Sequence, residues 1–276
     1  MFLLLRLSLS SIKNNINRFL KRLVCEDVPT QHLCIYKSFV FNLKAFGIKT
    51  ALKFPVFVFS NTKIYGIGDI KICCKISPGL LCIGKADSKS QGCTKLFNVG
   101  QIYIYGKTVI GGCVSISNVG TIVFKGNNVI SEGCTVVIRN KLTLGEYSRV
   151  GFHSFVMDSD EHFTIDVETK DVYPYTKPIE IGRFNWLGAY TFVKKGTKTP
   201  DYLIVASPNA LLCKDYMEMP PYSVIGGSPV RLLKTGIRRI FDVDKQRKLV
   251  LFFKENENVK KYTFDNDIDL DALCAY

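Results

Sequence analysis

The chain has 276 residues, and its 37 Lys and Arg against 24 Asp and Glu give a formal net charge of +13. Hydrophobic residues make up 47% of it, which excludes a disordered or collagen-like chain and suffices for a buried core. The charge favours anionic partners. We expect no nucleic acid partner, because the basic residues are spread along the chain without the basic and aromatic module of an RNA-binding sheet.

The ten cysteines form no Cys-x-x-Cys pair, and with only three histidines a Cys/His zinc site is not expected. Aliphatic residues or glycine flank several of them, as at Cys82 and Cys113. Cysteine in such surroundings is a small apolar filler. We therefore expect free thiols in a reducing cytosol, with Cys113, Cys134 and Cys213 as fillers in or beside the coils of the middle part of the chain.

The N-terminal segment predicts an amphipathic helix from about Leu7 onward. The apolar run at residues 1–5 has no positive charge before it and reaches Arg6 at once, which argues against a secretory signal. No stretch approaches the roughly 20 apolar residues of a membrane span. Either the helix docks on the rest of the protein, or its basic face lies on an anionic membrane surface. Its apolar face holds Ile12, Ile16, Phe19, Leu20 and Leu23.

The middle of the chain repeats aliphatic residues every six positions. An α-helix would place such residues on different sides, whereas short strands with a corner every six residues would point each of them inward. This pattern predicts a β-helix, with small residues such as Gly145, Gly151 and Gly182 at the corners. The three series are Ile104-Ile110-Ile116-Ile122, Ile138-Leu144-Val150-Val156 and Ile181-Leu187-Val193-Thr199-Val205-Leu211.

The register slips between the first two series, around residues 125–128, where we expect a loop or an irregular coil. The segment 64–83 is strand-like without a clear register. A β-sandwich of short strands stays open as the alternative fold.

The chain divides into three expected segments. Residues 1–60 would form the N-terminal helix and an extended lead-in, and residues 61–235 the β-helix domain with a loop at 157–177. Residues 236–276 would form a C-terminal helix, predicted over Ile237–Asn256, and a solvated acidic tail.

Five short motifs follow one another between Met157 and Ile240. They read MDSDEH at 157–162, KPIEIG at 177–182, NWLG at 185–188, VAS at 205–207 with KD at 214–215, and PYSVIGGSPVRLLK at 221–234. In this order and spacing they resemble the hexapeptide-repeat acyltransferases, in particular the sugar O-acetyltransferases of capsule, lipopolysaccharide and exopolysaccharide synthesis. Residues 36–56 resemble the N-terminal region of the same group more weakly.

The resemblance implies a left-handed parallel β-helix, assembled as a homotrimer with active sites between neighbouring subunits. It also implies acetyl-CoA as acyl donor, lying in a groove between adjacent chains, and no metal. The acceptor would be a sugar hydroxyl of a polysaccharide or of its lipid-linked or nucleotide-linked precursor.

His162 is the candidate general base. It ends the polar stretch 158–162, which interrupts the repeat and predicts a loop leaving the β-helix. Moving an acetyl group from a thioester to a hydroxyl requires a base for the hydroxyl proton, and an imidazole with a pKa near ~6.5 suits this role. In the resembling family the histidine at this place is the base. For His153, inside a hexad, we expect a structural or acceptor-binding role.

Asp158 and Asp160 are the candidate partners of His162. In an extended chain the three side chains project to the same side, so one carboxylate would accept the imidazole N–H and fix its tautomer. The residues alone leave open a divalent metal bound by this trio, or a solvated loop histidine without a role.

Four residues are candidates for the pantetheine end of the cofactor. By resemblance, Trp186 lies near the pantetheine or the acceptor, and the small Gly188 and Ala206, with Ser207, let the pantetheine lie against backbone amides. An amide directed at the developing oxyanion would stabilise the transition state. A plain packing aromatic and ordinary small corners are the alternatives.

Lys214, Arg231 and Lys234 are candidates for the coenzyme A phosphates, because a basic groove attracts them. The closing motif departs from the family's Pro-Ala-Lys, since it reads Pro229-Val230-Arg231. Valine alters the packing at the adenine end, while Arg231 keeps the charge. A basic surface without a ligand is the alternative.

The sequence therefore predicts an acetyl-CoA-dependent O-acetyltransferase of a sugar in surface polysaccharide synthesis, cytoplasmic or at the inner face of the membrane. Two alternatives stay open: an N-acetyltransferase of a nucleotide-linked amino sugar, and a non-catalytic β-helix scaffold.

Overall fold

The computed structural model describes residues 33–85, 92–206 and 208–274. The predicted helix after Leu7 and the candidate Ser207 lie outside these ranges. The described helices are α2 (Ile35–Phe46), α3 (Ile48–Ala51), α4 (Val243–Glu255) and α5 (Leu270–Leu273).

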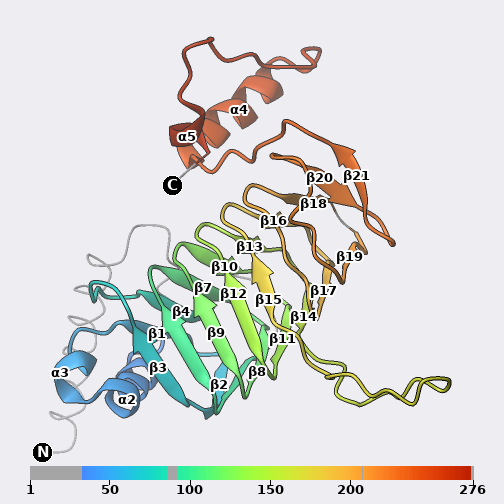
Figure 1. Cartoon of the computed structure of the whole chain (residues 1–276). Helices are drawn as coiled ribbons and strands as arrows, with labels where there is room; N and C mark the ends of the chain where they lie inside the picture. The colour runs from blue at the N-terminus through green and yellow to red at the C-terminus, as the bar shows by residue number, and fades with distance from the viewer. Residues whose placement is uncertain (1–32, 86–91, 207, 275–276) are drawn as a thin grey trace, which may run out of the picture.

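The strands form three sheets (Figure 1). Sheet I contains β1 (Val56–Val58), β4 (Leu81–Lys85), β7 (Thr108–Gly111), β10 (Asn128–Ile130), β13 (Arg149–Val150), β16 (Trp186–Leu187), β18 (Ile204–Ala206), β20 (Val224–Gly226) and β21 (Arg231–Lys234). Sheet II contains β2 (Thr62–Gly66), β5 (Thr94–Asn98), β8 (Ser115–Asn118), β11 (Thr135–Ile138), β14 (Phe155–Met157), β17 (Phe192–Lys194) and β19 (Leu211–Leu212). Sheet III contains β3 (Asp69–Ile72), β6 (Gln101–Ile104), β9 (Thr121–Phe124), β12 (Lys141–Leu144) and β15 (Ile179–Ile181).

The chain winds through sheets I, II and III in turn. Val129 pairs in parallel with Val109 before it and with Arg149 after it, so a coil in this part takes 20 residues. The winding is that of the predicted left-handed parallel β-helix (Figure 1). The β-sandwich alternative is wrong, because the strands of a sandwich pair antiparallel within each sheet, and here only β20 and β21 do so among the named strands.

The predicted inward residues form the core. Every member of the first two series is at most 2% exposed. In the third series the prediction for Leu211 is wrong: Leu212 is the fully buried residue and pairs with Val193. Val205 and Leu212 are seven positions apart in the sequence, one more than the six-residue spacing.

The expected loop at residues 125–128 is also absent. The sheet III side of this coil takes eight positions, from Ile122 to Ile130, and its strand β9 points both Ile122 and Phe124 inward, each 0% exposed. A tight turn follows, with positive φ angles at Gly126 (119°) and Asn127 (51°), and Ile130 is again fully buried. The six-residue register therefore slips here because the sheet III side of a coil is longer than the other two sides.

Close approach of successive coils explains the small corner residues. A Cβ added to Gly151 would lie 2.5 Å from the carbonyl carbon of Gly188 on the next coil, which is shorter than real Cβ contacts. Glycine at this corner thus keeps the two backbones in contact.

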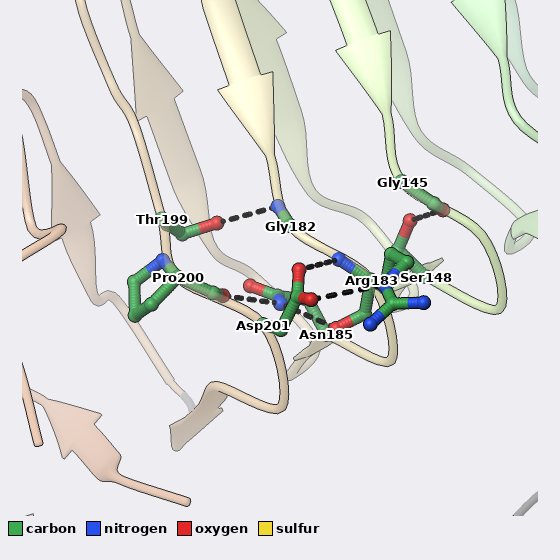
Figure 2. Close-up of polar contacts among 8 residues, drawn as sticks. All are labelled: Gly145, Ser148, Gly182, Arg183, Asn185, Thr199, Pro200 and Asp201. Carbon is green, nitrogen blue, oxygen red and sulfur yellow. Dashed lines mark hydrogen bonds and ion pairs between the residues drawn. The ribbon is translucent and has the colours of Figure 1, made fainter. Parts of the chain in front are cut away.

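Polar side chains hold the corner between sheets III and I (Figure 2). The backbone N–H and the Nε–H of Arg183 donate to the two carboxylate oxygens of Asp201, at 2.7 and 2.9 Å. The buried Asn185 donates from Nδ2 to the carbonyls of Arg183 (3.1 Å) and Pro200 (2.8 Å). These contacts replace backbone pairing where the chain turns.

Helix α2 covers the first strand of sheet I. The buried Asn42 donates from Nδ2 to the carbonyl of Val56 and accepts from its N–H, at 2.7 and 3.0 Å. The hydroxyl of Ser38 accepts from the N–H of Val58 at 2.8 Å. Two polar side chains therefore satisfy an edge strand that would otherwise present free backbone groups.

The C-terminal segment turns back onto sheet I, and the predicted C-terminal helix is α4. The guanidinium of Arg239 lies 4.5 Å from the ring centre of Trp186, and Phe241 is 3% exposed. Arg238 pairs with Asp271 at 2.7 Å, and the Asp271 side chain remains 84% exposed, in line with an acidic tail in solvent. None of the helices in the described ranges has the length and apolar character needed to cross a membrane.

Candidate functional site

A long arm leaves the β-helix between β14 and β15, at the predicted place (Figure 1). Its base is closed by an antiparallel bridge between Ser159 and Thr176 and by the N–H of Lys177, which donates to the carbonyl of Asp158 at 3.0 Å. A second bridge joins Ile165 and Val172. The coil therefore continues past the arm, and the arm is an ordered excursion.

His162 is exposed near the base of this arm. Glu161 before it has a positive φ of 60°, so the chain turns there and is not extended as expected. Within the described residues, no hydrogen bond or ion pair holds the imidazole. The predicted base is thus accessible, with its ring nitrogens open to a substrate or a second chain.

Asp158 is a buried residue that holds the arm to the coil. Its two carboxylate oxygens accept from the N–H groups of Arg139 and Asn140, both at 2.8 Å. Burial raises the pKa of this carboxyl, and the backbone hydrogen bonds oppose the rise. The structure therefore does not place Asp158 beside His162, contrary to the extended arrangement.

Asp160 faces lysines and not the imidazole. It pairs with Lys195 at 2.5 Å and with Lys194 at 3.8 Å. Glu161, the residue between it and His162, pairs with Arg139 at 2.9 Å. The expectation that one carboxylate orients His162 is not met within a single chain. No group of three potential metal ligands is gathered in the described part either, so the metal trio does not form there.

A cleft of about 620 Å³ opens beside the base of the arm, at the corner between sheets II and III. Asp160 brings the predicted polar stretch to this cleft, and Lys214 is the predicted phosphate ligand that lies there. The lining residues are Asp160, Lys177, Lys194, Lys195, Gly196, Leu211, Cys213, Lys214 and Asp215.

Sequence reasoning missed Lys177, Cys213 and Asp215 as members of one cleft. The signal is the strand register: Lys194 pairs with Met157, the last residue before the arm. Because the arm inserts many residues between these two strands, counting the sequence in steps of six does not reveal that they pair. Cys213 is exposed, so its predicted role as an apolar filler is wrong, while Cys134 is buried as expected.

The candidates for the pantetheine end lie on another side of the coil. Trp186 and Ala206 belong to sheet I, and Trp186 is 39% exposed beneath Arg239. The N–H of Gly188 donates to the carbonyl of Val205 at 2.9 Å, so this amide is committed to the coil and is not free for an oxyanion. The structure thus separates this group from the cleft within one chain.

Arg231 and Lys234 are the end residues of β21, which pairs antiparallel with β20. All four residues of this strand are exposed. It is the last strand of sheet I, so these two candidates also lie apart from the corner between sheets II and III that holds Lys214.

No family model matches the chain. The polySia-specific acetyltransferase NeuO is similar in structure, with 14% identity, a TM-score of 0.42 and coverage of 74% of this chain and 89% of that one. The polysialic acid O-acetyltransferase OatWY is similar with 16% identity, a TM-score of 0.41 and coverage of 70% and 96%. A hexapeptide-repeat acetyltransferase of Vibrio cholerae O1 biovar eltor, complexed with acetyl coenzyme A, is similar with 14% identity, a TM-score of 0.30 and coverage of 73% of this chain and 84% of that one. These likenesses concern the fold.

Proposed function

We propose that this protein is an acetyl-CoA-dependent O-acetyltransferase that acts on a sugar hydroxyl, with His162 as general base. The observation that carries the proposal is the arm between β14 and β15. It presents an accessible histidine two residues after Asp160, which lines a basic cleft. The motifs that resemble sugar O-acetyltransferases coincide with this arm and with the coils beside it.

The proposed reaction transfers the acetyl group directly to the acceptor, without an acetyl-enzyme intermediate. His162 takes the proton of the acceptor hydroxyl as the oxygen attacks the thioester carbonyl. The tetrahedral intermediate then collapses to the acetyl ester, the carbon–sulfur bond breaks, and the imidazolium returns its proton to the departing thiolate. An exposed imidazole without a fixed partner suits this role once substrate covers it.

Coenzyme A would contact this chain at sheet I. Arg231 and Lys234 on the exposed strand β21 supply charges for its phosphates, and Trp186 supplies an aromatic surface. The amide of Gly188 is excluded as an oxyanion donor by its bond to Val205. Which amide takes that place depends on how subunits assemble.

The outer face of sheet II supports the proposed homotrimer. Phe155, Phe192 and Leu211 stand in register on consecutive strands, and Phe192 is 43% exposed. A row of apolar side chains on the outside of a β-helix favours contact with another subunit. In such an assembly the sheet I group of one chain would meet the cleft of its neighbour, which a single chain keeps apart.

The test is acetyl transfer itself. The purified protein is incubated with acetyl-CoA and a panel of sugars, and free coenzyme A and the mass of the products are measured. The proposal expects release of coenzyme A that depends on the sugar, and a product whose acetyl group is removed by mild base. A base-stable amide would favour transfer to an amino sugar, and absence of acetyl-CoA binding by calorimetry would favour a scaffold.

A further inference from the structure

The cleft beside the arm carries more positive charge than the protein itself balances. Four lysines line it, against the two carboxylates of Asp160 and Asp215. Asp160 is already paired with Lys195 at 2.5 Å. The carboxylate of Asp215 accepts from the N–H of Met217 at 2.9 Å, so it too has a local partner.

Two of the ammonium groups in the cleft have no carboxylate partner among the residues that the structure describes. In the described residues no ion pair joins Lys177 or Lys214 to an acid, and the Lys214 ammonium lies 5.7 Å from the ring centre of Tyr216. Lys177 follows the arm and Lys214 follows β19, so the arm and the coil each contribute one of them. The site is thus suited to an anionic group held between two lysines.

We infer that the acceptor sugar carries a negative charge, a carboxylate or a phosphate, and that Lys177 and Lys214 bind this group; the inference rests on the proposed acetyl transfer. The base must touch the acceptor hydroxyl, and His162 is only two positions along the chain from Asp160, which lines the cleft. Within one chain the donor candidates Arg231 and Lys234 lie on sheet I, so the donor phosphates have cations other than these two lysines. Leu211 and Gly196 complete the wall with an apolar surface for a sugar ring.

Cys213 provides a test that does not depend on knowing the sugar, because its exposed thiol lines the same cleft. The rates of alkylation by the anionic iodoacetate and the neutral iodoacetamide are measured by peptide mass spectrometry in low salt. The exposed Cys73 on the other end of the molecule is the internal reference. The ratio of anionic to neutral rates at Cys213 should exceed that at Cys73 by roughly fivefold.

The double variant Lys177→Gln/Lys214→Gln should bring the two ratios together, as should high salt. The control Lys63→Gln, an exposed lysine on β2 at the opposite end of sheet II, should leave them unchanged. Equal ratios at Cys213 and Cys73 in the unaltered protein would overturn the inference.

Two measurements decide whether the anion that binds in the cleft belongs to the acceptor sugar or to coenzyme A: protection of Cys213 from alkylation, and the KM values of the two substrates. The inference expects glucuronic acid or glucose 6-phosphate at millimolar concentration to slow its alkylation more than glucose does. It also expects the double variant to raise the KM of an acidic acceptor by at least about tenfold without changing that of acetyl-CoA. Protection by coenzyme A alone, weakened with 3′-dephospho-coenzyme A, would assign the cleft to the donor and overturn it.

The failure of the inference and of the proposed function give different results. Acetyl transfer to neutral sugars only, unaffected by the double variant, would leave the proposed function standing and remove the anionic acceptor. Protection of Cys213 by acidic sugars without any release of coenzyme A would keep the anion site and remove the acetyl transfer.

Discussion

Asp158 shows at the scale of one residue how the arm is built. Asp158, Asp160 and His162 alternate in the sequence, and this spacing suggests that the three side chains share a catalytic role. In the structure Asp158 is instead buried, and its two carboxylate oxygens accept hydrogen bonds from the backbone N–H groups of Arg139 and Asn140. Its role is to fix where the arm begins.

Replacing Asp158 should therefore affect stability. Asp158→Ala leaves two backbone N–H groups without acceptors and should lower the free energy of unfolding by about 1–3 kcal/mol. Asp160→Ala, which removes partly exposed ion pairs, should cost less than about 1 kcal/mol. Thermal or denaturant unfolding measures both, and equal effects would contradict the assignment.

The same carboxyl makes a prediction about pH. Burial raises its pKa in the folded protein above the ordinary value of 3.8. The folded state thus holds this proton more tightly than the unfolded chain, so its contribution to stability is complete below about pH 4 and declines as the pH rises through the folded-state value. The difference in unfolding free energy between the unaltered protein and Asp158→Ala should be larger at pH 3.5 than at pH 7. A larger difference at pH 7 would reverse the sign of this account.

Among the elements, the corner between sheets III and I is held by a column of aromatic rings. Tyr147, Phe184, Tyr202 and Tyr222 occupy equivalent positions on successive coils, with ring centres 4.7, 4.9 and 5.3 Å apart. All four have positive φ angles, which cost an ordinary residue about 1 kcal/mol or more. Stacking and the guanidinium of Arg238, 4.6 Å from the Tyr202 ring, offset this cost.

Two substitutions at Tyr202 separate stacking from backbone strain. Tyr202→Ala loses the ring and keeps the strain, so it should destabilise the protein by about 2–4 kcal/mol. Tyr202→Gly loses the same ring and relieves the strain, and should be more stable than the alanine variant by about 1 kcal/mol. Denaturant unfolding of the two variants measures the difference. An alanine variant as stable as the glycine variant would contradict the claim that the positive φ at this position is strained.

The elements also show how far the sequence predicts the fold. Aliphatic residues every six positions predict the coils, because inward packing depends on local alternation and on one corner per hexad. The register fails at Leu211 and at residues 125–128, where a single extra residue or a longer third side shifts the count. The composition of the cleft depends on pairing across the arm, as with Met157 and Lys194, and no local pattern records that pairing.

For the whole molecule, the proposed trimer depends on the apolar row of sheet II. Phe192→Glu places a charge in that row and should convert trimers to monomers, because an unpaired buried charge costs about 3–5 kcal/mol. Thr143→Glu on the outer face of sheet III is the matched control and should remain trimeric. Light scattering gives the mass and circular dichroism the fold. A monomeric unaltered protein, or a trimer unchanged by Phe192→Glu, would contradict the proposed assembly.

The rate of coenzyme A release from acetyl-CoA in the presence of an acceptor sugar, compared between His162→Ala and His153→Ala, tests the central claim most directly. His153 is exposed and stacks on Tyr190 at 5.2 Å, so its loss controls for removal of a surface imidazole. We predict that His162→Ala lowers kcat by about 10²–10⁴ with an unchanged melting temperature. His153→Ala, at a position expected to have a structural or acceptor-binding role, should keep a kcat within a few-fold of the unaltered protein. A rate for His162→Ala close to that of the unaltered protein would contradict the account.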